Sequence, residues 1–294
     1  THAGFNAQGM VSMFQKLAQA SRLNDSGGFP YLRTHPLTTE RIGDMQARMG
    51  AQSASTQSQP GTLEHALMSA RARALMSTRA EEIEGLIHTY QQDAPRETNR
   101  LRLASMAYAA AMAYAQQRNE AQATQAVAKL QTLVQGDARA ERTVRGLAAD
   151  LQRRAGQPKA CVDTLMATDN DRPEVLLKGQ CQLALNDAAQ TRALIQRLQL
   201  WLAQYPRDAL AWELVSQAYA QNGQTLQAVR ADAESRAVRL DEVAAIDRLR
   251  AGQALARQLA QKGPLDLAAQ QEASIIDARM RSLEQTRLEL LRSR

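Results

Sequence analysis

Hydrophobic residues along most of this chain recur at intervals of three and four positions, the spacing that places side chains on one face of a helix. Three such stripes are clear: Met10, Met13, Phe14 and Leu17; Leu63, Leu67, Ala70 and Ala74; and Ile83, Leu86, Ile87 and Tyr90. We find no segment that alternates apolar and polar residues as a half-buried strand does. The pattern therefore predicts an all-α protein.

Brief turn signals, rich in Gly, Pro, Asn and Asp, divide the helical pattern. They lie at Asp93–Pro95, Gly136–Asp137, Gly156–Pro158, Asp169–Pro173, Leu185–Asp187, Tyr205–Pro206, Asn222–Gly223 and Gly263–Pro264. Helices of about ten to twenty residues between such short turns are typical of helical hairpins packed side by side. We therefore expect stacked hairpins and no mixed α/β fold.

One of these hairpins carries a recognisable repeat pattern. Pro206, Trp212, Val215, Ser216, Tyr219, Gly223 and Ala228 resemble a tetratricopeptide unit, in which a small residue lets two helices approach and aromatic residues fill the groove to the next pair. Tyr114 lies in a segment that echoes the residues around Tyr219, again ahead of an Ala-rich helix. We expect a tetratricopeptide-like solenoid, and the alternative is a helical bundle without repeats.

The composition fits closely packed helices. Hydrophobic residues make up 44% of the 294 residues and aromatic residues only 4%, so Ala and Leu supply most of the core. No apolar run approaches the ~20 residues that a membrane-spanning helix needs.

The chain is basic, with a formal net charge of +6 and 36 basic residues, of which only five are Lys. One interpretation is an anionic partner such as nucleic acid or a lipid surface. We favour the other, solvated helix faces on which Arg alternates with acidic residues, because no dense basic block occurs. The scarcity of aromatic residues also argues against binding of single-stranded nucleic acid.

The two cysteines, Cys161 and Cys181, match no metal-binding spacing. If residues 168–172 join two antiparallel helices, both cysteines lie at similar distances from the turn and could form a disulfide. The alternative is that both are small buried residues with free thiols.

The four histidines, His2, His35, His65 and His88, include no pair four residues apart, so the chain has no helical zinc clamp. His35 differs from the others because it precedes Pro36, which favours an extended conformation, and lies just before a capped helix. Its ordinary role would be to hold this turn by hydrogen bonds to the backbone.

Residues 1–49 resemble the end of the catalytic domain of BepA-like periplasmic zinc metallopeptidases, relatives of the HtpX and CAAX-prenyl-protease group. The resemblance rests on Ala3–Asn6, on the amphipathic helix after it, and on the run from Arg33 through His35 and Pro36 to Ile42. Residues 245–249 and 273–279 are similar to the closing helices of that family. The polar segment 50–61 is then a linker, and 62–294 is the repeat domain that follows it in the family.

The resemblance implies the C-terminal region of a zinc metalloendopeptidase, with zinc held by His-Glu-x-x-His and a later Glu that this chain lacks. We therefore expect no catalytic residue, no cofactor and no proteolysis in this chain alone. His35 is hypothesised to contact the zinc of the full-length enzyme. The repeat domain would bind protein substrates or outer-membrane assembly factors, with periplasmic localisation and an oxidising environment that favours the disulfide. The alternative is a stand-alone tetratricopeptide scaffold without catalysis.

The last helix has two interpretations as well. It carries several arginines, among them Arg279, Arg281 and Arg287, together with Glu284 and Glu289. We favour a polar cap on the end of the repeat domain over a helix that binds a membrane surface.

Overall fold

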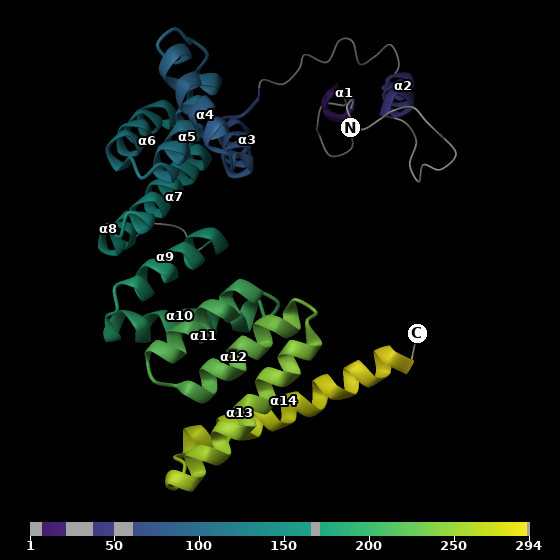
Figure 1. Cartoon of the computed structure of the whole chain (residues 1–294), viewed down its shortest axis with the longest axis vertical. Helices are drawn as coiled ribbons and strands as arrows, with labels where there is room; N and C mark the ends of the chain where they lie inside the picture. Colours follow the sequence, from purple (N-terminus) through teal and green to yellow (C-terminus); the bar gives the residue numbers. More distant parts are fainter. Residues whose placement is uncertain (1–7, 22–37, 50–60, 166–170, 293–294) are drawn as a thin grey trace. The chain divides into compact units, whose positions relative to one another are not determined.

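The computed structural model describes residues 8–21, 38–49, 61–165 and 171–292. Within these ranges the chain forms fourteen α-helices and no strand, which confirms the all-α prediction (Figure 1). The chain divides into two compact units, Thr1–Thr62 and Leu63–Arg294. The predicted linker, residues 50–61, lies outside the described residues except for Gly61.

The first unit contains α1 (Gln8–Ser21) and α2 (Thr38–Met49), which pack against each other. The predicted stripe Met10, Met13, Phe14 and Leu17 lies on the helix α1. Val11 is fully buried, whereas Met10, Met13 and Leu17 are 46%, 45% and 51% exposed. Among the described residues, α2 is the only helix against α1 within this unit, and one neighbouring helix covers only a narrow face.

The described part of the second unit contains twelve helices. They are α3 (Leu63–Met76), α4 (Ala80–Asp93), α5 (Arg100–Gln116), α6 (Glu120–Val134), α7 (Ala138–Arg154), α8 (Pro158–Thr164), α9 (Arg172–Ala184), α10 (Ala188–Gln204), α11 (Ala209–Gln221), α12 (Thr225–Val238), α13 (Glu242–Lys262) and α14 (Leu267–Arg292). The predicted breaks fall between helices at Ala94, Gly136, Gly156, Asn186, Tyr205, Asn222 and Gly263, and Asp93 is the last residue of α4.

Side chains cap the N-termini of most of these helices. An Asn or Asp accepts a hydrogen bond from a backbone N–H of the first turn in α5, α6, α7, α9, α10, α11 and α13. Such a cap satisfies one of the N–H groups that lack a partner in the helix and contributes roughly 1 kcal/mol. The caps fix where each helix begins after its turn.

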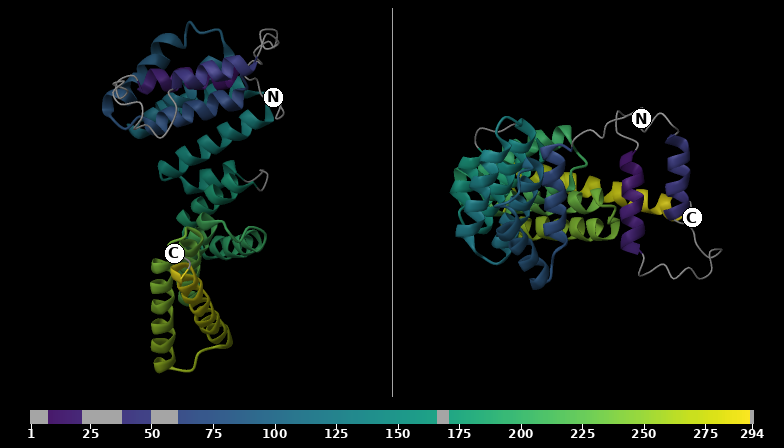
Figure 2. Two further views of the ribbon diagram at one scale, coloured as in Figure 1. Left: turned by 90° about the vertical axis from the view of Figure 1, so that its right-hand side faces the viewer. Right: turned by 90° about the horizontal axis from the view of Figure 1, so that it is seen from above.

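From α4 onward, consecutive helices of the second unit pack against each other, and α3 packs on α5. Figures 1 and 2 show the helices following one another in chain order. The odd-numbered helices α3, α5, α7, α9 and α11 also contact one another in sequence. The odd-numbered helices from α3 to α11 therefore form one layer of this unit. The buried side chains of this unit form five clusters, each built from helices close to one another in the chain, and two of the clusters share α5 and α6. They include the predicted stripe Leu63, Leu67, Ala70 and Ala74, which is buried as expected.

Four hairpins, α5–α6, α7–α8, α9–α10 and α11–α12, close with a residue in the left-handed backbone conformation. These residues are Arg118, Gly156, Asn186 and Gly223, with φ of 57°, 71°, 51° and 78°. In the turns at Arg118, Gly156 and Gly223, the residue after the left-handed one donates its N–H to the carbonyl oxygen five residues before it. The distance is 2.9 Å in each case. This is the Schellman arrangement, which ends one helix and reverses the chain.

Candidate functional site

A cavity of about 650 Å³ opens among the odd-numbered helices α3, α5, α7, α9 and α11, and we call it the odd-helix cavity. Its apolar lining includes Met68 of α3, Tyr108 of α5, Leu147 of α7, Leu176 of α9 and Leu210 of α11. Met68 and Leu210 are close to half exposed, whereas Tyr108 is fully buried. The cavity therefore has apolar side chains both at its floor and at its opening, and charged side chains such as Glu64, Arg139 and Glu174 lie among them.

Tyr108 presents its hydroxyl group to an arginine. Nη1 of Arg71 donates a hydrogen bond to the Tyr108 oxygen at 3.3 Å. Burial raises the pKa of Tyr108 above its ordinary value, and the hydrogen bond from Arg71 offsets only part of this effect. The phenol is therefore neutral at physiological pH and contributes an aromatic surface.

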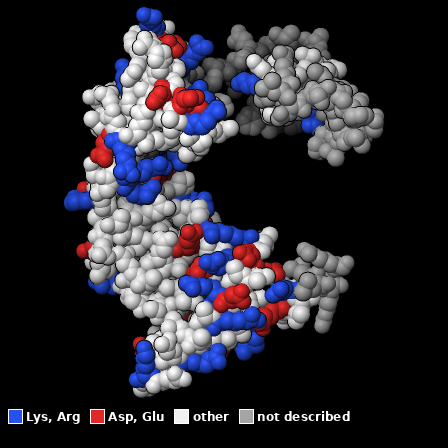
Figure 3. Space-filling view, in the orientation of Figure 1, with Lys and Arg blue, Asp and Glu red and all other residues white. Residues whose placement is uncertain are grey.

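Ion pairs connect α7 to α3 and to α9 beside the odd-helix cavity. On α7, Arg139, Arg142 and Arg145 approach Glu64 of α3, Asp171 at the start of α9 and Glu174 of α9, at 3.6, 3.5 and 3.3 Å. Each of these arginines is at least one third exposed, so each pair contributes little to stability, about 0–1 kcal/mol. They link α7 to α3 and to the start of α9. Figure 3 shows Lys and Arg side chains gathered at the level of α7.

Glu174 lies at the centre of this charged group and is 4% exposed. Its Oε1 pairs with Arg145, and its Oε2 has no hydrogen-bond donor among the described residues. Lys178 lies close by: burial lowers the pKa of Lys178, Arg197 lowers it further, and Glu174 opposes both effects. Cationic side chains thus surround one buried carboxylate in the wall of the cavity.

A second buried carboxylate, Asp208, joins three helices. It caps α11, and it accepts hydrogen bonds from Nε and Nη2 of Arg172 on α9, both at 2.8 Å, and from Nε1 of Trp201 on α10 at 3.0 Å. All of its oxygens therefore have donors. This side chain holds the fold and is not available to a ligand.

The residues of the predicted repeat unit lie where α11 meets its neighbours. Val215 and Tyr219 are buried, Ala228 of α12 is buried, and Gly223 forms the left-handed turn. The Ser216 hydroxyl donates to the Ala228 carbonyl oxygen at 2.8 Å, which shows how closely α11 and α12 approach. Trp212 is partly buried and donates from Nε1 to the Pro206 carbonyl oxygen at 2.9 Å.

Tyr114 and Tyr219 occupy equivalent positions. Each carbonyl accepts the N–H that closes the following turn, from Asn119 and from Gln224. Each hydroxyl accepts a hydrogen bond from a Gln of the preceding even-numbered helix, Gln91 at 3.1 Å and Gln199 at 2.9 Å. The echo between the two segments in the sequence thus corresponds to one local structure that occurs twice.

Cys161 of α8 and Cys181 of α9 form a disulfide, with Cα atoms 6.1 Å apart. Both residues are fully buried, in a cluster with Ala149, Val162 and Leu165. The bond joins the second helix of one hairpin to the first helix of the next. The two cysteines come before and after residues 166–170, which are outside the described part of the chain.

His35 also lies outside the described residues. His65 and His88 are exposed on α3 and α4. Across the described ranges, no group of three or more His, Cys, Asp or Glu side chains is arranged to hold a metal ion. The described residues therefore do not fit the zinc that the family resemblance implies for a full-length enzyme, and we derive no catalytic step from them. None of the described helices has the length and apolar composition to cross a bilayer.

The odd-helix cavity was not predicted from the sequence. Arg139, Arg142 and Arg145 follow one another at intervals of three, which places them on one side of α7. That spacing indicates a charged face on α7. Their partners, however, are between 29 residues (Asp171 and Glu174) and 75 residues (Glu64) away in the chain, and only the tertiary structure brings them together.

Comparison of the chain with models of known protein families gives no match, and comparison with curated proteins gives none either.

Proposed function

We propose that Leu63–Arg294 is a tetratricopeptide-like array of helical hairpins that binds segments of other proteins in the odd-helix cavity. The observation that carries this proposal is the left-handed turn that closes four successive hairpins, together with the equivalent hydrogen bonds of Tyr114 and Tyr219. Arrays of this kind expose one layer of helices as an extended binding surface.

The lining of the cavity suits an extended protein segment. Apolar side chains such as Met68 and Leu210 can cover the apolar residues of a ligand. The Oε2 of Glu174, which lacks a donor among the described residues, can accept a hydrogen bond from a backbone or side-chain N–H. A neutral donor suits this position better than a cation, since Arg145 and Lys178 already lie close to Glu174.

The test compares two substitutions of exposed apolar residues in the whole chain. Met68→Arg places a charge in the cavity, and Leu200→Arg makes the same kind of change on α10, where Leu200 is 73% exposed and lies outside this cavity. The probe is an unfolded outer-membrane β-barrel protein. We expect Met68→Arg to weaken binding about tenfold and Leu200→Arg to change the Kd less than about twofold. Equal Kd values for both variants and the unchanged chain would contradict the proposal.

We further propose that the chain is the C-terminal region of a BepA-like periplasmic zinc metalloendopeptidase that acts in quality control or assembly of outer-membrane proteins. The run from Arg33 to Ile42 supports this relationship. The Cys161–Cys181 disulfide supports an oxidising compartment such as the periplasm. The alternative is a tetratricopeptide scaffold that never carried a catalytic site. A His-Glu-x-x-His motif encoded upstream of Thr1 would favour the first proposal over the second.

In the peptidase proposal His35 contacts the zinc of the full-length enzyme and restrains its activity. The experiment is His35→Ala in that full-length protein, with proteolysis and zinc coordination both measured. We expect increased proteolysis and an altered zinc coordination shell. If both are unchanged, His35 has no role at the metal.

A further inference from the structure

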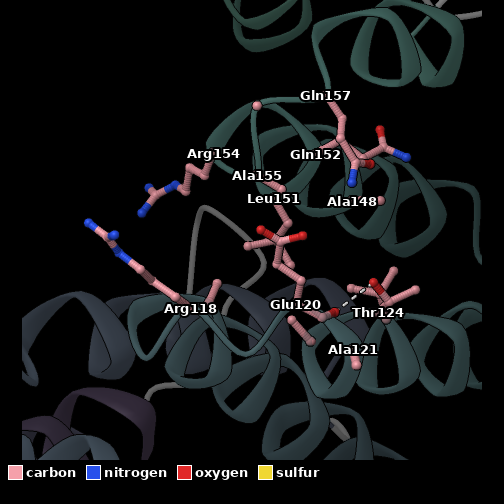
Figure 4. A pocket seen from close by; sticks show the side chains of 14 residues that line it. Arg118, Glu120, Ala121, Thr124, Ala148, Leu151, Gln152, Arg154, Ala155 and Gln157 are labelled. Carbon is pink, nitrogen blue, oxygen red and sulfur yellow. Dashed lines mark hydrogen bonds between the residues drawn. The ribbon is translucent and has the colours of Figure 1, made fainter.

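A second cavity, of about 810 Å³, lies where the hairpins α5–α6 and α7–α8 turn, and we call it the hairpin-tip cavity (Figure 4). Its lining comes from the end of α5, the first half of α6 and the end of α7. Ala121, Ala123, Ala148 and Ala155 contribute much of its apolar lining. Such small side chains leave the space between the helices unfilled, and Leu151 supplies a larger apolar surface within it.

Two arginines stand at one side of this cavity. Figure 4 shows Arg118 and Arg154 extending toward one another at its edge. Nε of Arg154 donates to Asp150 at 2.9 Å, but Asp150 also binds Arg153, so one carboxylate serves two guanidinium groups. The Arg118 guanidinium group makes no hydrogen bond or ion pair with other described residues. An anion that lies between two guanidinium groups is attracted by both positive charges.

The backbone at Arg118 is unusual for such a residue. Of the four equivalent turn positions, three hold Gly156, Asn186 and Gly223, and Gly and Asn adopt the left-handed conformation at little cost. Arg118 adopts it with φ of 57° and is thereby less favourable for folding than Gly would be. Residues kept in such conformations often act in binding.

Glu120 also lines this cavity. Figure 4 places its side chain inside the cavity, away from the two arginines. Its negative charge disfavours a ligand with several negative charges, such as a nucleic acid or an oligophosphate. It suits a ligand that carries a single carboxylate with an N–H donor nearby, which is the arrangement around an acidic residue in a polypeptide.

We propose that the hairpin-tip cavity binds an Asp or Glu side chain of a protein segment, with its carboxylate between Arg118 and Arg154. Apolar neighbours of that acidic residue pack on Leu151 and the alanines, and a backbone N–H of the segment donates to Glu120. Arg154 also lines the odd-helix cavity, but the site does not depend on binding there.

The experiment measures binding of a dye-labelled peptide, acetyl-Ala-Leu-Glu-Leu-Ala-amide, to the whole chain by fluorescence anisotropy. We expect Arg118→Gln and Arg154→Gln each to raise the Kd about tenfold, the effect of losing a hydrogen bond between charged groups. The peptide with Gln in place of Glu should bind the unchanged chain about tenfold more weakly, and the double variant should not distinguish the two peptides. The matched control is Arg96→Gln, an exposed arginine between α4 and α5, which should leave the Kd within about twofold.

The variant Arg118→Gly distinguishes an effect on peptide binding from an effect on the stability of the fold. This variant should unfold at a higher urea concentration than the unchanged chain and still bind the peptide more weakly. Free glutamate at 10 mM, as an approximate working concentration, serves as a competitor and should not displace the peptide. Failure of the peptide to bind, equal binding of its Gln analogue, unchanged Kd in both arginine variants, or displacement by free glutamate would each overturn the proposal.

Discussion

Leu240 adopts the left-handed backbone conformation, with φ of 64°, in the turn between α12 and α13. Its side chain is 85% exposed, so no burial compensates for the unfavourable backbone. The turn was not predicted from the sequence because Arg239, Leu240 and Asp241 contain neither Gly nor Pro. The tight connection between two packed helices imposes this conformation on a residue that does not favour it.

We expect Leu240→Gly to raise the free energy of unfolding by roughly 0.5–1 kcal/mol, since Gly adopts positive φ readily. Gly223→Ala, at a turn with φ of 78°, should lower it by roughly 1 kcal/mol. Urea unfolding followed by circular dichroism measures both. A loss of stability in Leu240→Gly would show that the leucine side chain contributes more than its exposure indicates.

Asp208 gives the fold a pH dependence. Burial would raise the pKa of Asp208, but hydrogen bonds from Arg172, Trp201 and the Ala211 N–H outweigh burial and hold this pKa below its ordinary value. A carboxylate whose pKa is lowered by folding stabilises the protein above its unfolded pKa of about 3.9. That contribution is lost as the pH falls through the lower pKa of the folded state.

The expected result is a stability that declines as the pH drops below about 5, with a smaller decline in Asp208→Asn than in the unchanged chain. Thermal unfolding between pH 7 and pH 3 measures it, with the exposed Asp163→Asn as the control. Identical pH profiles for the unchanged chain and Asp208→Asn would contradict this role of Asp208.

At the level of helices, the disulfide between α8 and α9 is the strongest link in the middle of the second unit. α8 is only seven residues long, so it buries little surface of its own. The bond between Cys161 and Cys181 spans 20 positions and restricts the unfolded chain. A loop of that length corresponds to about 3 kcal/mol in the chain-entropy model.

We expect Cys161→Ser with Cys181→Ser to lower the free energy of unfolding by about 2–4 kcal/mol. The chain without substitutions should lose a similar amount in dithiothreitol, and the double variant should not respond to it. Hydrogen exchange should show the largest change in α8 and the start of α9. A stability unaffected by dithiothreitol would mean that the bond is absent in solution.

The last helix, α14, is held by buried apolar residues, Ile276 and Leu283, and by charged contacts with α12. Arg279 forms two hydrogen bonds with Glu234 of α12, at 2.8 and 2.9 Å, and Arg230 of α12 pairs with Glu272. Figure 3 shows basic and acidic side chains interspersed over α12–α14. The sequence predicts a polar end of the repeat domain here. The residues of each ion pair are more than 40 positions apart in the chain, so local patterns do not reveal which residues pair.

At the scale of the molecule, all five buried clusters consist of residues from Leu63 onward. The first unit, by contrast, leaves Met10, Met13 and Leu17 about half exposed. Two helices with so little buried surface are marginal on their own. The second unit therefore has the means to fold without the first.

A chain that begins at Leu63 should keep its helical circular dichroism and should unfold within a few degrees, roughly 3 °C, of the whole chain. Thermal unfolding of both chains measures this. Loss of the helical signal in the shorter chain would show that residues 1–62 take part in the core of the second unit.

The sequence by itself determined the helices and most of their ends. Periodic apolar residues, Asn and Asp caps and Gly turns act over a few positions, so they can be read locally, as at Asn222 and Gly223. The similarity of Tyr114 to Tyr219 likewise anticipated a local structure that occurs twice. Only the tertiary structure decided which side of α1 is buried, which carboxylates bind Arg139, Arg142 and Arg145, and where cavities remain. These features depend on contacts between residues far apart in the chain, and helical periodicity carries no information about the partner of a helix face.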